Sequence, residues 1–205
     1  MAKWERTHYL RPTLTVAEDL LGKYLVRRCD NDLLIGRICE TEAYIASGDK
    51  ACHAYNYKRT PRTETMFSIG GTAYIYLIYG MYSCLNLVTE PEGEPCAVLI
   101  RGLQPRFGIE RIAENRYGCS TSLFTPYQQK NFLNGPGKVC QGLSLTTREN
   151  GLSLIGDKLF VCESLSDIGL APFEGDEIPI QIQTGKRIGV EYAEECADYL
   201  WRFFF

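Results

Sequence analysis

The chain of 205 residues carries 22 Lys and Arg against 25 Asp and Glu, a formal net charge of −3. With 45% hydrophobic and 23% charged residues, 19 Gly and 9 Pro, it is neither disordered nor fibrous, and it fits a single globular domain over residues 1–205. The acidic balance counts, at first sight, against binding to nucleic acid.

The cysteines indicate a reducing compartment. Nine cysteines occur without any C-x-x-C pair, and only two histidines accompany them, so the sequence predicts neither a disulfide framework nor a zinc site. No segment approaches the roughly 20 apolar residues of a membrane span. We therefore expect a cytoplasmic protein with no metal, no cofactor and no membrane contact.

The first third of the sequence predicts a helix and then a long strand. Thr15 and Glu18 have the spacing of a capping box, and basic residues follow as far as Arg28, which favours an amphipathic helix. Residues 33–45 are apolar and β-branched without a helical period, which indicates a strand. The polar, basic residues 45–71 then form a connection long enough to carry function.

A hairpin is the clearest element of the middle of the chain. Residues 72–79 and 82–89 have strand character and are separated only by Gly80-Met81, the spacing of a two-residue turn. We expect a further strand over residues 97–103, then a helix over residues 104–116. A Gly/Pro turn at residues 134–137 precedes a short helix.

The last third predicts strands again, with a helix at the end. Residues 152–161 read as strands folded about Gly156-Asp157, residues 177–183 alternate Ile with polar residues, and residues 191–201 favour a helix. Strands and helices therefore mix without βαβ regularity. This pattern predicts an α+β fold with a largely antiparallel sheet.

Glu40, Glu42 and Tyr44 alternate along the first long strand and should share one face. Two carboxylates and a phenol in a line form either a solvated edge or a catalytic set, and the pentapeptide alone does not decide. Residues two apart on a strand lie about 7 Å apart. That spacing would also suit an inverting carbohydrate hydrolase that uses Glu40 and Glu42.

The loop before the hairpin combines basic and aromatic side chains. Residues 50–62 include Arg59, Arg62 and two lysines, no acid, and His53 among tyrosines. Such a loop could be merely solvated, but basic side chains also suit phosphates and rings suit bases. The absence of acids favours anion binding.

The hairpin carries Tyr74, Tyr76, Tyr79 and Tyr82. Cross-strand packing accounts for tyrosines within the strands. It does not account for Tyr79 and Tyr82 at the turn, beside Met81, where a strand pair usually meets solvent. We interpret the tip as a wedge between base pairs.

Asn86 and Arg101 each interrupt an apolar strand, so each is either a structural hydrogen-bonding residue or part of a pocket. The sequence contains no nucleophile elbow, Walker loop or dinucleotide fingerprint. A carboxylate that activates water is therefore the best available catalyst.

A series of motifs across nearly the whole chain resembles the alkyladenine (3-methyladenine) DNA glycosylase family, in its bacterial form. The motifs are Ala17-Glu-Asp-Leu-Leu-Gly-Lys, Gly36-Arg-Ile-Cys-Glu-Thr-Glu-Ala-Tyr, Asp49 to His53, Arg59-Thr-Pro-Arg-Thr with Met66-Phe67, Tyr74-Ile-Tyr-Leu-Ile-Tyr-Gly-Met, Asn134-Gly-Pro-Gly-Lys-Val-Cys-Gln and Arg187-Ile-Gly-Val. Ser68-Ile-Gly-Gly departs from the Gly-Pro-Pro-Gly common in bacterial members. This departure lies just before the hairpin.

The resemblance implies a single α+β domain with a curved sheet, a protruding hairpin and surrounding helices. It implies a monomeric, monofunctional enzyme that flips alkylated purines out of duplex DNA and hydrolyses the N-glycosidic bond, leaving an abasic site. By the same resemblance Glu42 is the general base and Arg101 an arginine beside it. A carbohydrate hydrolase and a catalytically silent lesion-binding protein are the alternatives.

The resemblance also assigns the remaining site residues. Tyr44 and His53 line one side of the base pocket, Tyr76 lies on the other side, and Asn86 discriminates against the amino group of guanine. Tyr79 fills the gap that the flipped nucleotide leaves in the duplex. The residues expected to contact DNA beside it are Met81, Tyr82, Arg59 and Arg62.

The charge is unevenly distributed along the chain. Residues 1–150 contain 18 basic and 15 acidic residues, whereas residues 151–205 contain 4 and 10. We therefore expect the acidity to lie away from the site, and DNA binding to be modest and salt-dependent.

Overall fold

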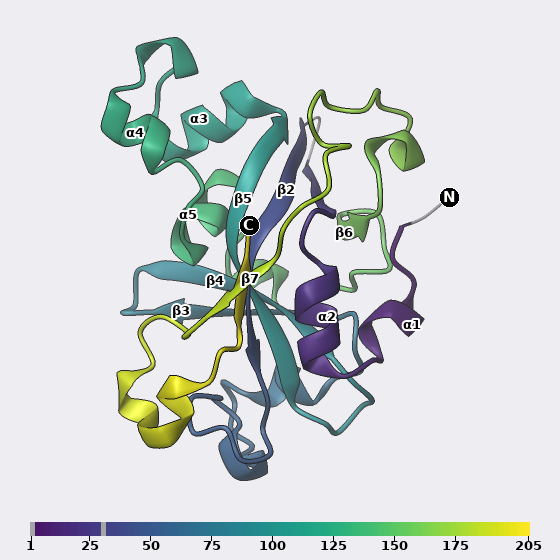
Figure 1. Ribbon diagram of the computed structural model, residues 1–205, viewed down its shortest axis with the longest axis vertical. Coiled ribbons are helices and arrows are strands. Elements are labelled where there is room, and N and C mark those ends of the chain that lie inside the picture. The colour runs from purple at the N-terminus through teal and green to yellow at the C-terminus, as the bar shows by residue number, and fades with distance from the viewer. Residues whose placement is uncertain (1–2, 30–31) are drawn as a thin grey trace.

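The computed structural model describes residues 3–29 and 32–205, which form one antiparallel sheet with helices around it (Figure 1). The helices are α1 (Arg6–Tyr9), α2 (Thr13–Asp19), α3 (Ile109–Tyr117), α4 (Pro126–Lys130) and α5 (Pro136–Gly142). The strands are β1 (Tyr24–Cys29), β2 (Asp32–Tyr44), β3 (Ala73–Ile78), β4 (Tyr82–Thr89), β5 (Cys96–Phe107), β6 (Leu159–Cys162), β7 (Gln183–Gly185) and β8 (Arg202–Phe204). The predicted α+β class is confirmed.

The sheet has the order β3-β4-β5-β2-β1-β6, and β8 pairs with the end of β2 that β1 leaves free. Its two longest strands, β2 and β5, change register at Ile35/Gly36, Ile38/Glu40 and Glu40/Thr41. Such bulges bend and twist a strand pair. Figure 1 shows the result, with the β3–β4 hairpin crossing the long axis of β2 and β5.

The main core lies between the sheet and the helices. Helix α2 packs on β2 and β5, while α5 packs on β4 and β5. The largest fully buried side chains include Trp4, Tyr9, Leu20, Leu34, Ile38, Leu85 and Leu87. Among residues 3–29 and 32–205, no helix is long and apolar enough to cross a membrane.

The short helix predicted to start at Thr15, with Lys23, Arg27 and Arg28 after its first turn, is present but has different bounds. Helix α2 begins at Thr13 and stops at Asp19, and β1 starts at Tyr24. The residues after the helix pair with β2 on one side and β6 on the other. Thr15 therefore lies inside the helix rather than at its N-cap, and strand pairing takes the basic residues Arg27 and Arg28 out of the helix.

The helix expected over residues 104–116 begins later than predicted. Strand β5 continues to Phe107, which pairs with Ile35 of β2. Gly108 then turns the chain at φ 70°, and a Cβ there would stand 2.4 Å from the Leu33 carbonyl oxygen. Only glycine fits this approach, and α3 starts directly after it.

The predicted hairpin is confirmed, with a shifted turn. Its central residues are Tyr79 and Gly80, at φ 52° and 68°, rather than Gly80 and Met81. The Met81 N–H donates to the Ile78 carbonyl, and Ile78 pairs with Tyr82. Both central residues thus have the positive φ of mirror-image turns.

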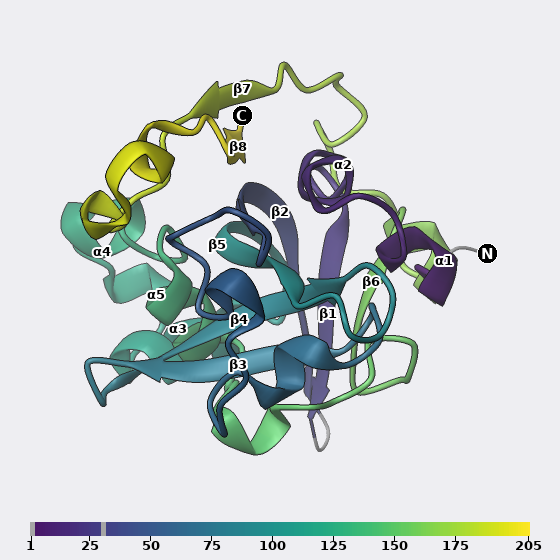
Figure 2. The ribbon, with the colours of Figure 1, turned by 90° about the horizontal axis from the view of Figure 1, so that it is seen from below.

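The last third departs furthest from the predicted elements. Residues 152–161 supply only the start of β6, and residues 177–183 are irregular until β7. The expected terminal helix is a 3-10 segment, Glu191–Asp198, interrupted at Glu194 (φ 52°), and the last residues form β8 instead. Figure 2 shows this yellow C-terminal segment arching along one side of the molecule.

Candidate active site

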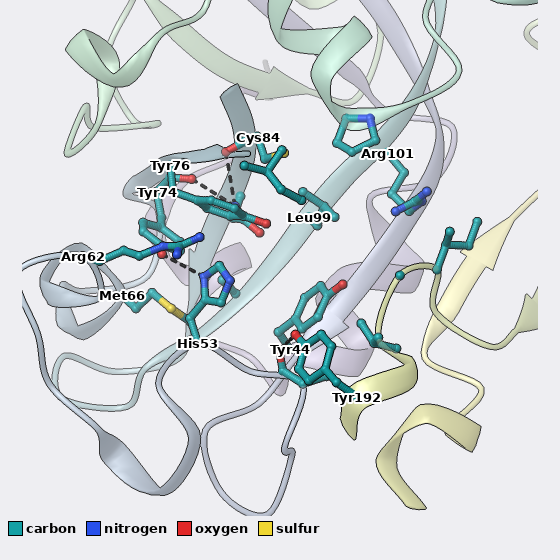
Figure 3. A pocket seen from close by; sticks show the side chains of 18 of the residues that line it. Tyr44, His53, Arg62, Met66, Tyr74, Tyr76, Cys84, Leu99, Arg101 and Tyr192 are labelled. Atoms are coloured by element: carbon teal, nitrogen blue, oxygen red, sulfur yellow. Dashed lines mark hydrogen bonds between the residues drawn. The ribbon is translucent and has the colours of Figure 1, made fainter. Parts of the chain in front are cut away.

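A cavity of about 580 Å³ opens where the hairpin, β5, the loop after β2 and the C-terminal segment meet (Figure 3). Its volume lies within the range of about 300–1,000 Å³ typical of ligand pockets. The lining includes Tyr44, His53, Tyr76, Asn86 and Arg101. The structure thus gathers these five predicted site residues around one cavity.

Glu42 lies directly behind the cavity wall and is fully buried. Its Oε2 accepts hydrogen bonds from the Tyr44 hydroxyl at 2.8 Å and from Arg101 Nη1 at 3.3 Å. Its Oε1 accepts from the Ile188 backbone N–H at 2.7 Å. Three donors therefore surround the one carboxylate, and all three residues line the cavity.

Burial raises the pKa of Glu42 above its usual value, because a charged carboxylate loses its hydration. Arg101, the Ile188 N–H and the Tyr44 hydroxyl oppose this rise by favouring the ionised form. Such a balance is typical of a carboxylate that works as a general base.

A β-bulge directs Arg101 onto the carboxylates. In the ladder of β2 and β5, Glu40 pairs with Gly102 and Thr41 pairs with Ile100, so Arg101 is the extra residue between them. Bulges often redirect a side chain beside an active site. The Arg101 side chain reaches Glu42 on one side and Glu40 Oε1, at 3.4 Å, on the other.

Glu40 shares the face of Glu42, as its alternation on the strand predicts, but it has different partners. Its Oε1 pairs with Arg202 Nη1 of β8 at 2.9 Å and with Arg101. Thr41, between the two acids, points the other way and donates to the Ala17 carbonyl. Glu40 is therefore held by two arginines, whereas Glu42 is the acid next to the aromatic cavity.

His53 and Tyr76 form one wall of the cavity, with ring centroids 4.5 Å apart and nearly perpendicular. The His53 Nδ1 also lies 3.0 Å from the Tyr74 hydroxyl. The structure groups His53 with Tyr76, whereas the resemblance placed it beside Tyr44, and Figure 3 shows Tyr44 on a separate part of the wall. Burial and the neighbouring Arg62 lower the pKa of His53 to about 4, so the imidazole is neutral at pH 7.

The two arginines of the basic loop have different surroundings. The Arg62 guanidinium lies over the Tyr76 ring, 5.0 Å from its centroid, and lines the cavity. Arg59 is exposed and forms two hydrogen bonds with Glu64, at 2.9 and 2.6 Å. Arg59 therefore already has an anionic partner.

Asn86 is buried in β4 at the cavity. Its Nδ2 donates to the Tyr74 carbonyl at 3.2 Å and to the Cys84 carbonyl at 3.4 Å. Backbone bonds therefore orient the amide, which satisfies the requirement for a buried polar group and presents Asn86 at the pocket.

The hairpin tip is the most exposed aromatic part of the site. Tyr79 is 83% exposed, Met81 70% and Tyr82 51%. Tyr79 also lines the cavity, so the tip stands directly beside the pocket. Cβ of Tyr82 packs closely against Gly137 of α5, which supports the base of the tip.

Sequence reasoning missed the contribution of the C-terminal segment. Ile188, Glu191 and Tyr192 line the cavity, and the Ile188 N–H contacts Glu42. The expectation that the acidic last quarter lies away from the site is therefore wrong. The motif Arg187-Ile-Gly-Val, one of those that resemble the family, is the signal in the sequence that points to this segment.

Within residues 3–29 and 32–205, no group of three or more His, Cys, Asp or Glu side chains is placed to hold a metal ion. The nine cysteines are free thiols.

Comparison with known families identifies this arrangement. The family model of methylpurine-DNA glycosylase (MPG) matches residues 7–205. The chain belongs to the methylpurine-DNA glycosylase family. Membership confirms the resemblance and the predicted class of enzyme, a DNA-repair glycosylase that hydrolyses N-glycosyl bonds, with DNA as its substrate.

Curated relatives agree with this membership over almost their whole length. A protein of Clostridium perfringens strain SM101 is 47% identical over 97% of this chain and 93% of its own. A protein of Bacillus cytotoxicus is 47% identical over 96% and 93%, and one of Clostridioides difficile is 41% identical over 98% of each chain. Each is named "Putative 3-methyladenine DNA glycosylase".

Proposed function

We propose that this methylpurine-DNA glycosylase removes alkylated purines such as 3-methyladenine from duplex DNA, with Glu42 activating the attacking water. The observation that carries the proposal is the buried Glu42 carboxylate, bonded to Arg101 and Tyr44 at the wall of an aromatic cavity. The whole chain, residues 1–205, then works as one glycosylase domain, as a monomer on DNA in the cytoplasm.

The cavity wall suits a flipped, positively charged base. Alkylation at a purine ring nitrogen gives the base a positive charge, which is attracted to the faces of aromatic rings. Tyr44 and Tyr76 offer such faces, and the neutral His53 adds no charge that would repel the base. A flipped base is therefore bound here by stacking and cation–π contacts.

The chemistry needs one base and one stabilising charge. Ionised Glu42 takes a proton from water as the oxygen bonds to C1′, and the C1′–N bond breaks with its electron pair leaving on the base. The carboxylate also stabilises the positive charge that develops on the sugar. Arg101 and the Ile188 N–H hold the carboxylate ionised despite its burial.

Asn86 is proposed to restrict the bases that enter. Its amide is held at the cavity by the backbone of Tyr74 and Cys84, and cannot easily turn away from a base that does not fit. An exocyclic amino group next to this fixed amide, as in guanine, would be crowded.

The hairpin tip is proposed to replace the flipped nucleotide. Tyr79, Met81 and Tyr82 project from the strands, and Tyr79 adjoins the cavity. Apolar and aromatic wedges of this kind unstack a base step from the minor groove. A base that leaves the duplex at Tyr79 is thus directly beside the pocket. Arg62, which lines the pocket, and Arg59 of the same loop are proposed to contact phosphates.

The test is base release from an oligonucleotide with one alkylated purine, measured under single turnover. We expect Glu42→Gln to lower the rate by about 10² to 10⁴, the usual contribution of a general base. The matched variant Glu40→Gln, on the same face of β2, should lose less than about tenfold because its carboxylate is held by Arg202. Retained activity in Glu42→Gln would remove the assignment.

The same experiment decides between the alternatives. The carbohydrate hydrolase would be favoured if the unaltered protein hydrolysed a glycan and released no base from DNA. Glu40→Gln and Glu42→Gln should then lose the glycan-hydrolysing activity equally. Tight binding of lesion DNA by the unaltered protein, without any base release, would favour the silent lesion-binding protein.

A further inference from the structure

A fully buried ion pair joins the C-terminal segment to the loop that follows β2. Arg187 Nη1 donates to Asp49 Oδ2 at 2.6 Å, and Arg187 Nη2 donates to Asp49 Oδ1 at 2.7 Å. Neither side chain is exposed. Taking two charges out of water is unfavourable unless further hydrogen bonds compensate, so the remaining contacts of this pair indicate what it holds in place.

Two further contacts of Arg187 lie beside the proposed catalytic residues, and two others, with the Cys196 carbonyl at 3.1 Å and the Trp201 ring at 5.1 Å, tie it to the C-terminal segment. Its Nη1 also donates to the Ala43 carbonyl at 2.9 Å, which lies on β2 between Glu42 and Tyr44. The guanidinium lies over the Tyr44 ring, 4.8 Å from its centroid. Arg187 therefore holds both the backbone between the two residues and the ring of one of them.

Arg187 also directly precedes a residue that donates a hydrogen bond to Glu42. The next residue, Ile188, donates its backbone N–H to Glu42 Oε1 at 2.7 Å. A peptide N–H can point only where the planar peptide unit joining it to the preceding residue directs it. Asp49, the anchor, is itself held by the N–H groups of Ile45 and Ala51, at 3.3 and 3.0 Å.

We propose that Arg187 and Asp49 are positioning residues of the glycosylase, which keep the Ile188 N–H on the Glu42 carboxylate and the Tyr44 ring at the cavity wall. The inference rests on the proposed role of Glu42. Neither residue touches the reacting atoms. Their effect passes through the Ile188 N–H and through Tyr44.

The sign of the effect follows from the groups that face Glu42. They are Tyr44 and Glu40 on β2, Arg101 on β5, Arg202 on β8, and Arg187 with the Ile188 N–H on the C-terminal segment. Loss of the Ile188 bond removes a donor to the ionised carboxylate, and loss of Arg187 removes a nearby positive charge. Both changes raise the pKa of Glu42 and so reduce its ionised fraction at low pH.

The same strand offers a matched control. Arg37 of β2 donates to Asp176 Oδ1 at 3.0 Å and to the Asp176 carbonyl at 3.1 Å, and its guanidinium lies over the Phe205 ring. The side chains of Arg37 and Asp176 are almost fully buried. Arg37→Met should therefore destabilise the fold as Arg187→Met does, without touching the cavity.

The test compares Arg187→Met and Arg37→Met in full-length protein, by single-turnover base release against pH and by thermal melting. We expect Arg187→Met to lower the maximal rate at least tenfold and to move the acid limb of the profile to higher pH. Arg37→Met should keep the maximal rate and the position of the acid limb. Arg187→Lys keeps the charge but not the two-point contact with Asp49. It should return the acid limb part of the way to its original pH and restore little of the maximal rate.

The positioning role would be overturned if Arg187→Met and Arg37→Met had similar melting temperatures and also the same maximal rate and the same acid limb. If Arg187→Met does not fold, Asp49→Asn decides by the maximal rate alone, because it keeps the shape of the side chain and the Arg187 charge but loosens the anchor of Arg187. A maximal rate equal to that of Arg37→Met would then overturn the positioning role. Failure of the proposed function looks different: the unaltered protein would then release no base, or Glu42→Gln would remain active.

Discussion

The Tyr44 hydroxyl donates a hydrogen bond of 2.8 Å to Glu42 Oε2 from two positions further along the same face of β2. Tyr44 therefore connects the two proposed tasks of the site, because its ring lines the base cavity and its hydroxyl supports the ionised carboxylate. Burial raises the pKa of Glu42. As the pH falls, base release should therefore begin to decline at a higher pH than it would if Glu42 were an exposed glutamate.

Replacement of Tyr44 by Phe separates those two tasks. The ring remains for stacking, but the ionised carboxylate loses one donor, and such a bond stabilises a charged group by about 1.5 kcal/mol or more. We expect the acid limb of base release to move up by about one pH unit. The measurement is the pH dependence of the single-turnover rate, with Tyr76→Phe as the control, and an unmoved limb in Tyr44→Phe would contradict the expectation.

His53 should make the stability of the protein depend on pH. Its pKa is about 4 in the folded chain, against 6.5 when unfolded, because of burial and Arg62. Between pH 6.5 and 4 the unfolded chain takes up a proton that the folded chain does not, so the free energy of unfolding falls as the pH is lowered through this window. The contribution amounts to at most about 3 kcal/mol.

His53→Gln should therefore flatten the pH dependence of stability in that window. Urea unfolding at several pH values between 4 and 7 measures it. The same slope in the variant and the unaltered protein would show that His53 is not the group responsible.

Tyr79 should affect recognition of damage more than folding. It is 83% exposed, so Tyr79→Ala removes little packing and should leave the melting temperature almost unchanged. We expect the variant to bind lesion duplex about tenfold or more weakly, and undamaged duplex about equally well. Tyr127→Ala, another exposed tyrosine on α4, is the control, and equal losses on both duplexes would argue against a wedge.

The ion pair of Arg59 with Glu64 should limit non-specific DNA binding. Both side chains are more than half exposed, so the pair adds little to stability. Glu64→Gln frees the guanidinium for a phosphate, and we expect tighter binding to undamaged duplex at low salt and a salt slope steeper by about 1. Adding Arg59→Gln should cancel the gain. A gain that persists in the double variant would assign it to another cation.

The hairpin and the Glu42 strand follow from local patterns. Apolar and β-branched residues without a helical period over 33–45 predict a strand, and on a strand Glu40, Glu42 and Tyr44 share one face; β2 has that arrangement. Strand–turn–strand spacing predicts the β3–β4 hairpin with its exposed tip. Both depend on interactions between neighbours in the chain, which the sequence records directly.

What the sequence by itself determined is the α+β class, the hairpin and, through its motifs, the glycosylase family with seven predicted site residues that do line one cavity. Only the tertiary structure decided that Arg101 is a bulge residue aimed at Glu42, that His53 stands with Tyr76, and that the acidic C-terminal segment completes the site. Those features depend on contacts between residues far apart in the chain. No local period or spacing encodes a hydrogen bond such as that from Ile188 to Glu42, because it forms only once the sheet has curled and the C-terminal segment has docked on it.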